Sequence, residues 1–130
     1  DVVDAALKGD VERVESLLVR MTEAGEDAGQ VAGPCYRHVV RLQELHLAIE
    51  RGQTPDQAVR GAKPVIFFKR IQEIAAQLKA WDLAELMSAA ATLSQAIQQG
   101  RGSQGLGKAI GMRSLPSIAQ RGRTLRARNI

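Results

Sequence analysis

The sequence predicts an all-α fold, a single bundle of about five main helices in one domain. Only 3% of the 130 residues are aromatic, whereas Ala, Leu, Gln and Arg are plentiful, a composition that suits helices better than strands. Apolar residues also recur at spacings of three and four along most of the chain. With 45% hydrophobic residues, the chain can bury a modest core.

Two helices are expected at the start of the chain. The first covers about residues 1–8 and is closed by Gly9, and Asp10 is expected to cap the second. Gly25 is expected to end this second helix. Its apolar stripe consists of Val11, Val14, Leu18 and Met21.

A long helix is expected over about residues 31–50, with Pro34 in its first turn and Gly52 just beyond its end. Its stripe consists of Val31, Cys35, His38, Leu42, Leu45 and Ile49. Thr54 and Pro55 then have the pattern of an N-cap followed by proline at the first helical position, which predicts a short helix.

The aromatic residues gather in the next helix, which we expect to begin near Pro64 and to reach Ala80. Its stripe has spacings of four, three, four and three and consists of Phe67, Ile71, Ile74, Leu78 and Trp81. Aromatic side chains bury large areas, so Phe67 and Trp81 are expected to lie together in the core. Phe68 falls outside the stripe and is expected to contact another helix or subunit.

Asp82 and Glu85 match the outline of a capping box and open a helix that continues to about Ile97. This helix is expected to form an antiparallel hairpin with the preceding one. Glycines are then frequent over residues 100–111, which predicts a flexible segment. A last, basic helix is expected from Ser114, with Pro116 in its first turn.

The residues expected in the core combine these stripes. They are Leu18, Leu42, Leu45, Phe67, Ile71, Ile74, Leu78, Trp81, Leu86, Leu93 and Ile97.

Charge is distributed unevenly along the chain. Residues 1–99 contain 11 Lys and Arg against 14 Asp and Glu, whereas residues 100–130 contain seven basic residues and no acidic ones. A basic segment of this kind is typical of contact with phosphates or with an acidic partner, although it can also be merely solvated. The candidate DNA or partner contacts are Arg101, Lys108, Arg113, Arg121, Arg123, Arg126 and Arg128.

Phe68, Lys69 and Arg70 form a second candidate site, for a protein partner. An aromatic and basic surface of this kind could also bind nucleic acid. The simpler interpretation is that the aromatic rings turn inward while the cations face solvent.

No catalytic, cofactor or metal site is predicted. Cys35, His38 and His46 supply at most three loosely spaced ligands, whereas a structural zinc site needs four. Cys35 could be a thiolate nucleophile, but its place in an apolar stripe favours a small, inert core residue. The carboxylates lie mostly on polar helix faces, where solubility explains them.

The single cysteine, Cys35, excludes a disulfide within the chain and favours the cytoplasm. No apolar run reaches the ~18 residues that a membrane span needs, so we expect no membrane association. The chain opens on Asp1 rather than on methionine, which indicates a piece of a longer protein.

Four segments carry a family resemblance, namely residues 4–10 (Asp-Ala-Ala-Leu-Lys-Gly-Asp), 51–55 (Arg-Gly-Gln-Thr-Pro), 64–70 (Pro-Val-Ile-Phe-Phe-Lys-Arg) and 78–81 (Leu-Lys-Ala-Trp). In this order, and with a second long helix after them, they resemble the C-terminal domain of the delta subunit of bacterial DNA polymerase III. The resemblance covers most of residues 1–99.

The resemblance implies a helical collar domain that joins the subunits of the clamp loader, which loads the sliding clamp onto primed DNA during replication. The partners would be the other loader subunits, with indirect access to primer-template DNA. Contact with the sliding clamp would belong to parts of the subunit outside this chain. The chain itself would not be an enzyme, although its parent would belong to the polymerase holoenzyme, a nucleotidyltransferase.

Two other classes of function remain open. One is a free-standing basic helical module that binds nucleic acid through residues 100–130. The other is an enzyme whose catalytic residues cannot be recognised from the sequence.

Overall fold

The computed structural model describes residues 1–100 and 104–128, with side chains described for residues 1–27, 29–99 and 113–128. The elements are α1 (Val2–Lys8), α2 (Val11–Glu23), η1 (Ala28–Val31), α3 (Ala32–Glu50), α4 (Pro55–Arg60), η2 (Phe68–Arg70), α5 (Ile71–Ala80), α6 (Leu83–Gly100) and α7 (Gln104–Arg128). The all-α class is confirmed. The described residues form seven α-helices rather than the five expected.

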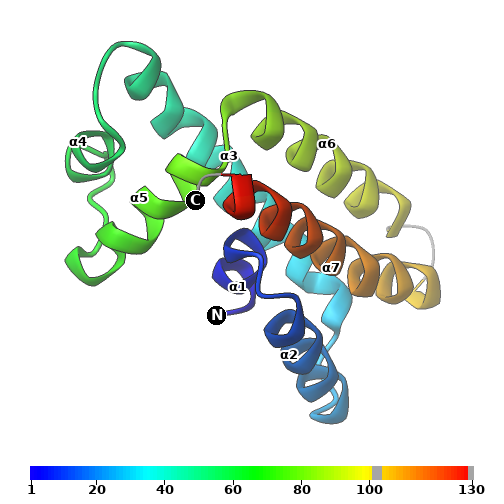
Figure 1. Ribbon diagram of the computed structural model, residues 1–130. Coiled ribbons are helices and arrows are strands. Elements are labelled where there is room, and N and C mark those ends of the chain that lie inside the picture. The colour runs from blue at the N-terminus through cyan, green and yellow to red at the C-terminus, as the bar shows by residue number, and fades with distance from the viewer. Residues whose placement is uncertain (101–103, 129–130) are drawn as a thin grey trace.

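Helix α7 lies in the middle of the bundle (Figure 1), where it packs against α1, α2, η1 and α6. Helix α3 lies behind it and packs against α6, α4 and η1. Helices α4 and α5 pack on each other and form a smaller group at one side of the bundle. None of the described helices has the length and apolar character needed to cross a membrane.

The first two helices confirm the sequence prediction, and local capping explains both. The Asp1 carboxylate accepts hydrogen bonds from the backbone N–H groups of Val3 (2.7 Å) and Asp4 (3.1 Å) at the start of α1. Gly9, with φ of 83°, ends this helix. The Asp10 carboxylate caps α2 by accepting from the Arg13 backbone N–H at 3.2 Å.

The next two helices also follow their sequence signals. Helix α3 covers Ala32–Glu50, close to the expected range. Thr54 accepts from the Gln57 backbone N–H at 3.1 Å, and the Gln57 side chain accepts from the Thr54 backbone N–H at 2.9 Å. This reciprocal capping box, followed by Pro55 at the first position, opens α4 as expected.

The expected helix from Pro64 is wrong in its first part. Helix α5 begins only at Ile71, after the short helix η2, and Phe67 has an extended backbone with φ of −54° and ψ of 132°. The Arg41 guanidinium donates hydrogen bonds to the carbonyls of Lys63 (2.8 Å) and Pro64 (2.6 Å). These hydrogen bonds tie the carbonyls of Lys63 and Pro64 to α3 and hold this part of the chain in a turn.

Phe67 is consequently not in the core. Its side chain is 58% exposed, and Phe67 and Trp81 are not buried together. Trp81 itself is fully buried. The rest of the expected core is confirmed, with Leu18, Leu42, Leu45, Ile74, Leu78, Leu86 and Leu93 buried and Ile71 and Ile97 partly buried.

Helices α5 and α6 do not form the expected hairpin, because α6 packs against α3 and α7 instead. The chain is extended at Trp81, with φ of −104° and ψ of 111°, where it turns from one helix to the other. Asp82 accepts from the Glu85 backbone N–H at 2.8 Å, which confirms it as a cap. The Glu85 carboxylate pairs with Arg121 rather than completing a capping box.

The last helix is longer than expected, because α7 begins at Gln104 rather than at Ser114 and Pro116 lies in its interior. Among the described side chains of α7, residues 113–128, the buried ones are Ser114, Leu115, Ile118, Ala119 and Leu125. These contacts make α7 part of the core. Residues 101–103 lie outside the described part of the chain, and the flexibility of the glycine-rich segment stays a prediction.

A glycine pair lets α1 and α7 approach closely. A Cβ atom at Gly9 would lie 2.4 Å from the Arg123 backbone nitrogen, and one at Gly122 would lie 2.9 Å from the Ala6 carbonyl oxygen. Both distances are shorter than van der Waals contact allows. The two helices therefore meet backbone to backbone at this crossing.

Candidate functional site

The most exposed apolar surface among the described residues is the segment of residues 64–68, which follows α4 and ends at the first residue of η2. We call this segment the aromatic turn. The exposed fractions are 76% for Val65, 58% for Phe67 and 70% for Phe68. The two phenylalanine rings pack edge to face, with centroids 4.9 Å apart and an interplanar angle of 67°. A contiguous apolar patch of this kind is typical of an interaction site.

The aromatic turn is held at its base by two contacts. The first is the pair of hydrogen bonds from Arg41, on α3, to the carbonyls of Lys63 and Pro64. The second is Ile66, which is partly buried and packs against the core between its exposed neighbours. These contacts fix the backbone, while the side chains of Val65 and Phe67 stay largely exposed.

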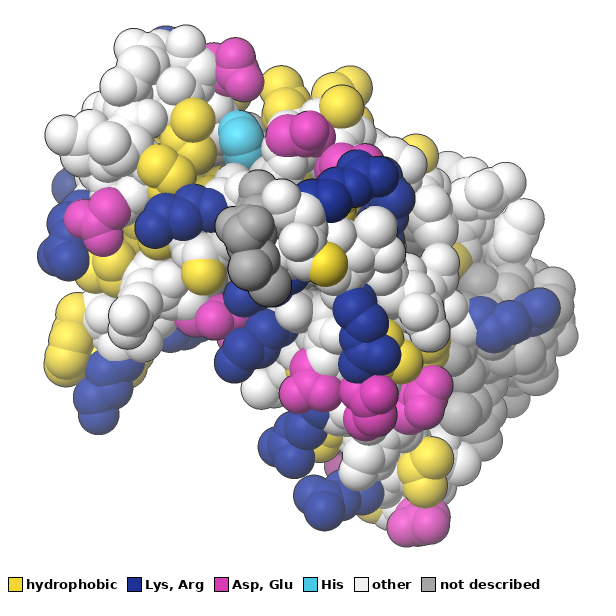
Figure 2. All heavy atoms as spheres, in the orientation of Figure 1, with side chains coloured by type: hydrophobic (Ala, Val, Ile, Leu, Met, Phe, Trp, Pro, Cys, Tyr) yellow, Lys and Arg dark blue, Asp and Glu magenta, His cyan; other side chains and the backbone are white. Residues whose placement is uncertain are grey.

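Cations flank the aromatic turn. Lys63 and Lys69 are exposed, and neither forms an ion pair with the described residues. Figure 2 shows hydrophobic side chains protruding at the left edge, over the segment between α4 and α5, with Lys or Arg side chains beside them. Of the predicted partner interface, Phe68 and Lys69 are thus exposed.

Arg70, the third predicted interface residue, is held by an ion pair, unlike Phe68 and Lys69. Its Nη2 atom donates to both carboxylate oxygens of Asp4, at 2.8 and 2.7 Å, so it does not simply face solvent as the sequence indicated. The pair joins η2 to α1. The Arg70 side chain is still 40% exposed.

A buried polar network lies behind this pair. Gln77 is fully buried, and its amide oxygen accepts from His38 Nε2 at 2.6 Å. Its amide nitrogen donates to the carboxylates of Asp4 (2.9 Å) and Glu73 (3.2 Å). No sequence pattern predicted a role for Gln77 or for the Asp4 carboxylate. The available signal was a polar glutamine directly before Leu78, a residue of the apolar stripe.

A cleft of about 500 Å³ lies beneath the aromatic turn. Leu42 and Ile74 contribute aliphatic surface from α3 and α5, and Ile66 contributes it from the turn. The polar lining consists of His38, Arg41 and Arg70. Pro64, Val65 and Phe67 of the aromatic turn line it as well. None of the described lining residues is a carboxylate, so the cleft combines apolar and cationic side chains.

Three of the arginines in residues 100–130 are paired with carboxylates, although no acidic residue lies near them in the sequence. Arg121 donates to Glu85, Arg123 donates to Glu12, and Arg126 donates to Glu73 at 3.3 Å. These partners lie on α6, α2 and α5, far away in the sequence. Figure 2 shows the resulting mixture of basic and acidic side chains over the middle of the molecule.

Two of these pairs change the ionisation of their carboxyls. The hydrogen bond from Arg121 lowers the pKa of Glu85, and the hydrogen bond from Arg123 lowers the pKa of Glu12. Of the other predicted contacts, Arg113 and Arg128 are exposed on α7. Arg101 and the Lys108 side chain lie outside the described part of the structure.

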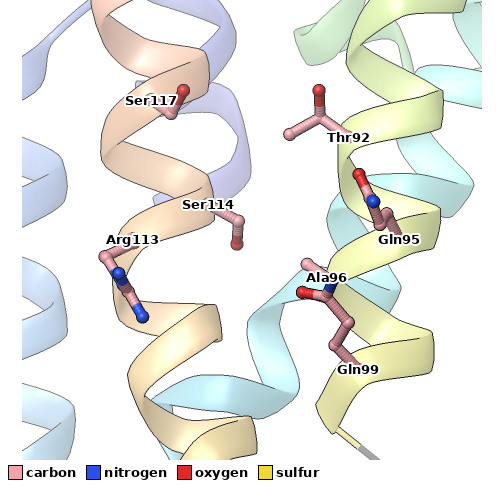
Figure 3. Close-up of a pocket in the computed structure, with 7 residues that line it drawn as sticks. All are labelled: Thr92, Gln95, Ala96, Gln99, Arg113, Ser114 and Ser117. Atoms are coloured by element: carbon pink, nitrogen blue, oxygen red, sulfur yellow. The ribbon is translucent and has the colours of Figure 1, made fainter.

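A second, more polar groove of about 370 Å³ lies between α6 and α7. Figure 3 shows Thr92 and Gln99 of α6 and Ser114 of α7 on the sides of their helices that face each other, whereas Arg113 lies toward the other edge of α7 in this view. The lining consists of Thr92, Gln95, Ala96 and Gln99 from α6 and Arg113, Ser114 and Ser117 from α7. Such hydroxyl and amide groups can form hydrogen bonds but do not by themselves specify a ligand.

Cys35 and the two histidines occupy structural positions. Cys35 is fully buried, and burial raises the pKa of its thiol to about 12, which disfavours a thiolate nucleophile. His46 Nε2 lies 3.2 Å from the Leu78 carbonyl and 2.8 Å from the Trp81 carbonyl, so this nitrogen carries the proton. Within the described residues, no three His, Cys, Asp or Glu side chains are grouped to hold a metal ion.

Comparison with protein-family models, curated proteins and solved structures finds no match for this chain.

Proposed function

We propose that this chain is an assembly domain whose aromatic turn docks onto a neighbouring protein subunit. More specifically, on the resemblance carried by residues 1–99, we propose that it is the C-terminal collar domain of the delta subunit of a bacterial DNA polymerase III clamp loader. The observation that carries the docking role is the exposure of Val65, Phe67 and Phe68 on a turn held by Arg41.

The energetics of interfaces support this role. Aromatic residues are enriched at the centres of protein interfaces, where a few of them contribute much of the binding free energy. A surface that already has its bound conformation loses less entropy on association. Arg41 and Ile66 restrain the backbone of the aromatic turn in this way.

The resemblance supports the same surface. Its most specific segment, residues 64–70, includes the exposed Phe67 and Phe68. In this proposal the chain works by binding and not by catalysis, its partners are the other loader subunits, and its location is the cytoplasm. The sliding clamp would contact other parts of the parent subunit.

A nucleic-acid-binding module is less well supported. Arg121, Arg123 and Arg126 already pair with carboxylates of the body, which reduces the positive charge that α7 offers to phosphates. Binding through this helix would be strongly dependent on salt, with a slope of about −0.9 per neutralised phosphate on a double-logarithmic plot.

Co-purification of the chain with clamp-loader subunits tests the proposal. We expect the double variant Phe67→Ser and Phe68→Ser to lose the association while it keeps the parent's melting temperature. Leu47→Ser and Met87→Ser replace apolar side chains with exposed fractions of 49% and 56% elsewhere on the surface, so this double variant is the matched control. Equal retention of both variants would contradict docking through the aromatic turn.

A further inference from the structure

We propose that the cleft beneath the aromatic turn binds an acidic, apolar segment of the partner protein, with an apolar side chain in the cleft and a carboxylate at its edge. This inference rests on the proposed docking function and specifies the chemistry of the partner. It concerns the cleft, whereas the docking role was argued from the exposed side chains of Val65, Phe67 and Phe68. Val65 and Phe67 belong to both surfaces, because they also line the cleft.

The floor of the cleft fits an apolar side chain. Leu42 is fully buried, Ile74 is 6% exposed and Ile66 is partly buried, and these three residues come from three different segments of the fold. The volume of about 500 Å³ lies within the range typical of sites that enclose a ligand group. An aliphatic or aromatic group entering here would remove apolar surface from water at both partners.

The edge of the cleft fits a carboxylate. Arg70 uses only Nη2 to bind Asp4, so its Nε and Nη1 groups have no hydrogen bond to the described residues. A guanidinium can bind a carboxylate through two parallel hydrogen bonds, and charge makes such bonds stronger than neutral ones. Arg70 is therefore already oriented by one carboxylate while it keeps donors for a second.

The charge around the cleft also favours an acidic partner. Lys63 and Lys69 directly precede and follow the aromatic turn in the sequence, and neither has an ion-pair partner among the described residues. The nearby carboxylates are already engaged, since Asp4 binds Arg70 and Glu44 lies 3.6 Å from Arg41. The surroundings of the cleft thus have a positive excess, which attracts carboxylates and repels a basic segment.

Single-stranded nucleic acid is the other anionic polymer to consider. It binds through bases stacked on open aromatic faces. Here Phe67 and Phe68 pack edge to face against each other, and Phe67 is the one aromatic side chain among the described lining residues, beside the aliphatic Leu42, Ile66 and Ile74. The geometry therefore favours a protein segment, and an oligonucleotide serves as one arm of the test.

The test is a titration of the ¹⁵N-labelled full chain, followed by backbone amide chemical shifts. The probes are a short amidated peptide in which Leu and Phe alternate with Glu, a twin with Lys in place of Glu, a second twin with Ser in place of Leu and Phe, and a short oligothymidine. We expect only the first peptide to shift the amides of residues 63–70 and those around Leu42 and Ile74. Added salt should weaken its binding.

Two charge-reversal variants supply the matched comparison. Lys63→Glu with Lys69→Glu should weaken binding of the acidic peptide by roughly tenfold, because it reverses the charge beside the cleft. Arg13→Glu with Arg20→Glu makes the same change in net charge on the exposed side of α2 and should leave the affinity within about twofold of the parent. Both variants alter exposed side chains, so a shared loss of affinity would show that net charge alone acts and would overturn the inference.

The inference is also overturned if the acidic peptide leaves the cleft amides unchanged, if its Lys or Ser twin shifts them equally, or if only oligothymidine shifts them. Failure here is distinguishable from failure of the proposed function. If the phenylalanine variants lose the loader subunits but the acidic peptide does not bind, docking stands and the partner chemistry is wrong. If the peptide binds the cleft but loader subunits do not associate with the chain, the clamp-loader assignment fails while the chemistry of the cleft stands.

Discussion

The Trp81 indole nitrogen donates a hydrogen bond of 2.9 Å to the main-chain carbonyl of Leu7, and both side chains are fully buried. The Trp81 carbonyl in turn accepts from His46 Nε2 at 2.8 Å. The residue that joins α5 to α6 is therefore bonded to both α1 and α3. Trp81 therefore stabilises the fold through hydrogen bonds as well as through burial of its ring.

Replacing Trp81 should reveal both contributions. Trp81→Ala should lower the free energy of unfolding by about 3–5 kcal/mol, because it leaves a large cavity. Trp81→Phe keeps an aromatic ring but removes the donor to Leu7, which should cost roughly 1–3 kcal/mol. Urea unfolding measures both values. A Trp81→Phe chain as stable as the parent would show that this hydrogen bond contributes nothing.

Phe67 should behave differently from Trp81, although the spacing of the sequence placed both in one stripe. Phe67→Ala should change the free energy of unfolding by less than about 0.5 kcal/mol, because the ring is already 58% exposed. Thermal melting of the variant beside Trp81→Ala checks this. A loss of several kcal/mol would mean that the ring is buried after all.

Trp81 and Phe67 show how far the sequence predicts the fold. Signals that act within one helical turn, such as the caps at Asp10 and Thr54, correctly placed the ends of α2 and α4. Helical periodicity correctly predicted the buried face of α5. Periodicity failed at Phe67 because Arg41 binds the carbonyls of Lys63 and Pro64, which lie 22 and 23 positions further along the chain. These hydrogen bonds favour a turn there. A pattern of spacings contains no information about such a distant donor.

The glycine at the end of α1 offers a test of close packing. Gly9 has φ of 83° and Gly25 has φ of 79°, but a Cβ at Gly9 would collide with the backbone of α7 whereas one at Gly25 would meet nothing within 4 Å. Gly25→Ala should therefore cost about 1 kcal/mol for the left-handed backbone alone. Gly9→Ala should cost about 1–3 kcal/mol more, because it also forces α1 away from α7.

Urea unfolding of the two variants separates backbone strain from collision. Equal destabilisation by both substitutions would contradict the close approach of α1 and α7. A further check is Gly122→Ala, which carries the collision without a left-handed backbone. It should also destabilise the chain, because its Cβ would lie 2.9 Å from the Ala6 carbonyl oxygen.

The Arg121 and Glu85 pair should affect stability only above acidic pH. Arg121 holds the pKa of Glu85 below its ordinary value of 4.5 in the folded chain, so the stabilisation is complete above that value and is lost as the pH falls through the folded pKa. Melting curves of the parent and Arg121→Gln should differ slightly at pH 7 and converge in acid. Solvent screening keeps the difference small. A difference that grows on acidification would contradict the pair.

Cys35 should report opening of the core. Its thiol is fully buried, and burial raises its pKa to about 12, so a thiol-specific reagent at neutral pH should react only when the chain opens. We expect the modification rate to rise with urea in parallel with unfolding. Rapid modification of the folded chain would place the thiol at the surface, and complete reaction in denaturant is the control.

The candidate site was only partly predictable. Phe68 and Lys69 were expected at a partner surface because Phe68 lay outside the helical stripe, and both side chains are exposed. The role of Arg70 depends on Asp4, which is 66 positions away, and no local pattern indicates that pairing. The pairs of Arg121 and Arg123 were unpredictable for the same reason, because their carboxylate partners are distant in the sequence and lie on α6 and α2.

The central position of α7 has a consequence for synthesis on the ribosome. Glu12 and Arg123 meet across 111 positions, and Leu115, Ile118 and Leu125 complete a core that begins with α1. At translation rates of about 5–20 residues per second, the first two helices wait roughly 5–20 s for this partner. During that interval Val14 and Leu18 on α2 lack some of the contacts that bury them in the complete fold. A nascent chain of this protein should therefore be a substrate for chaperones until α7 has emerged.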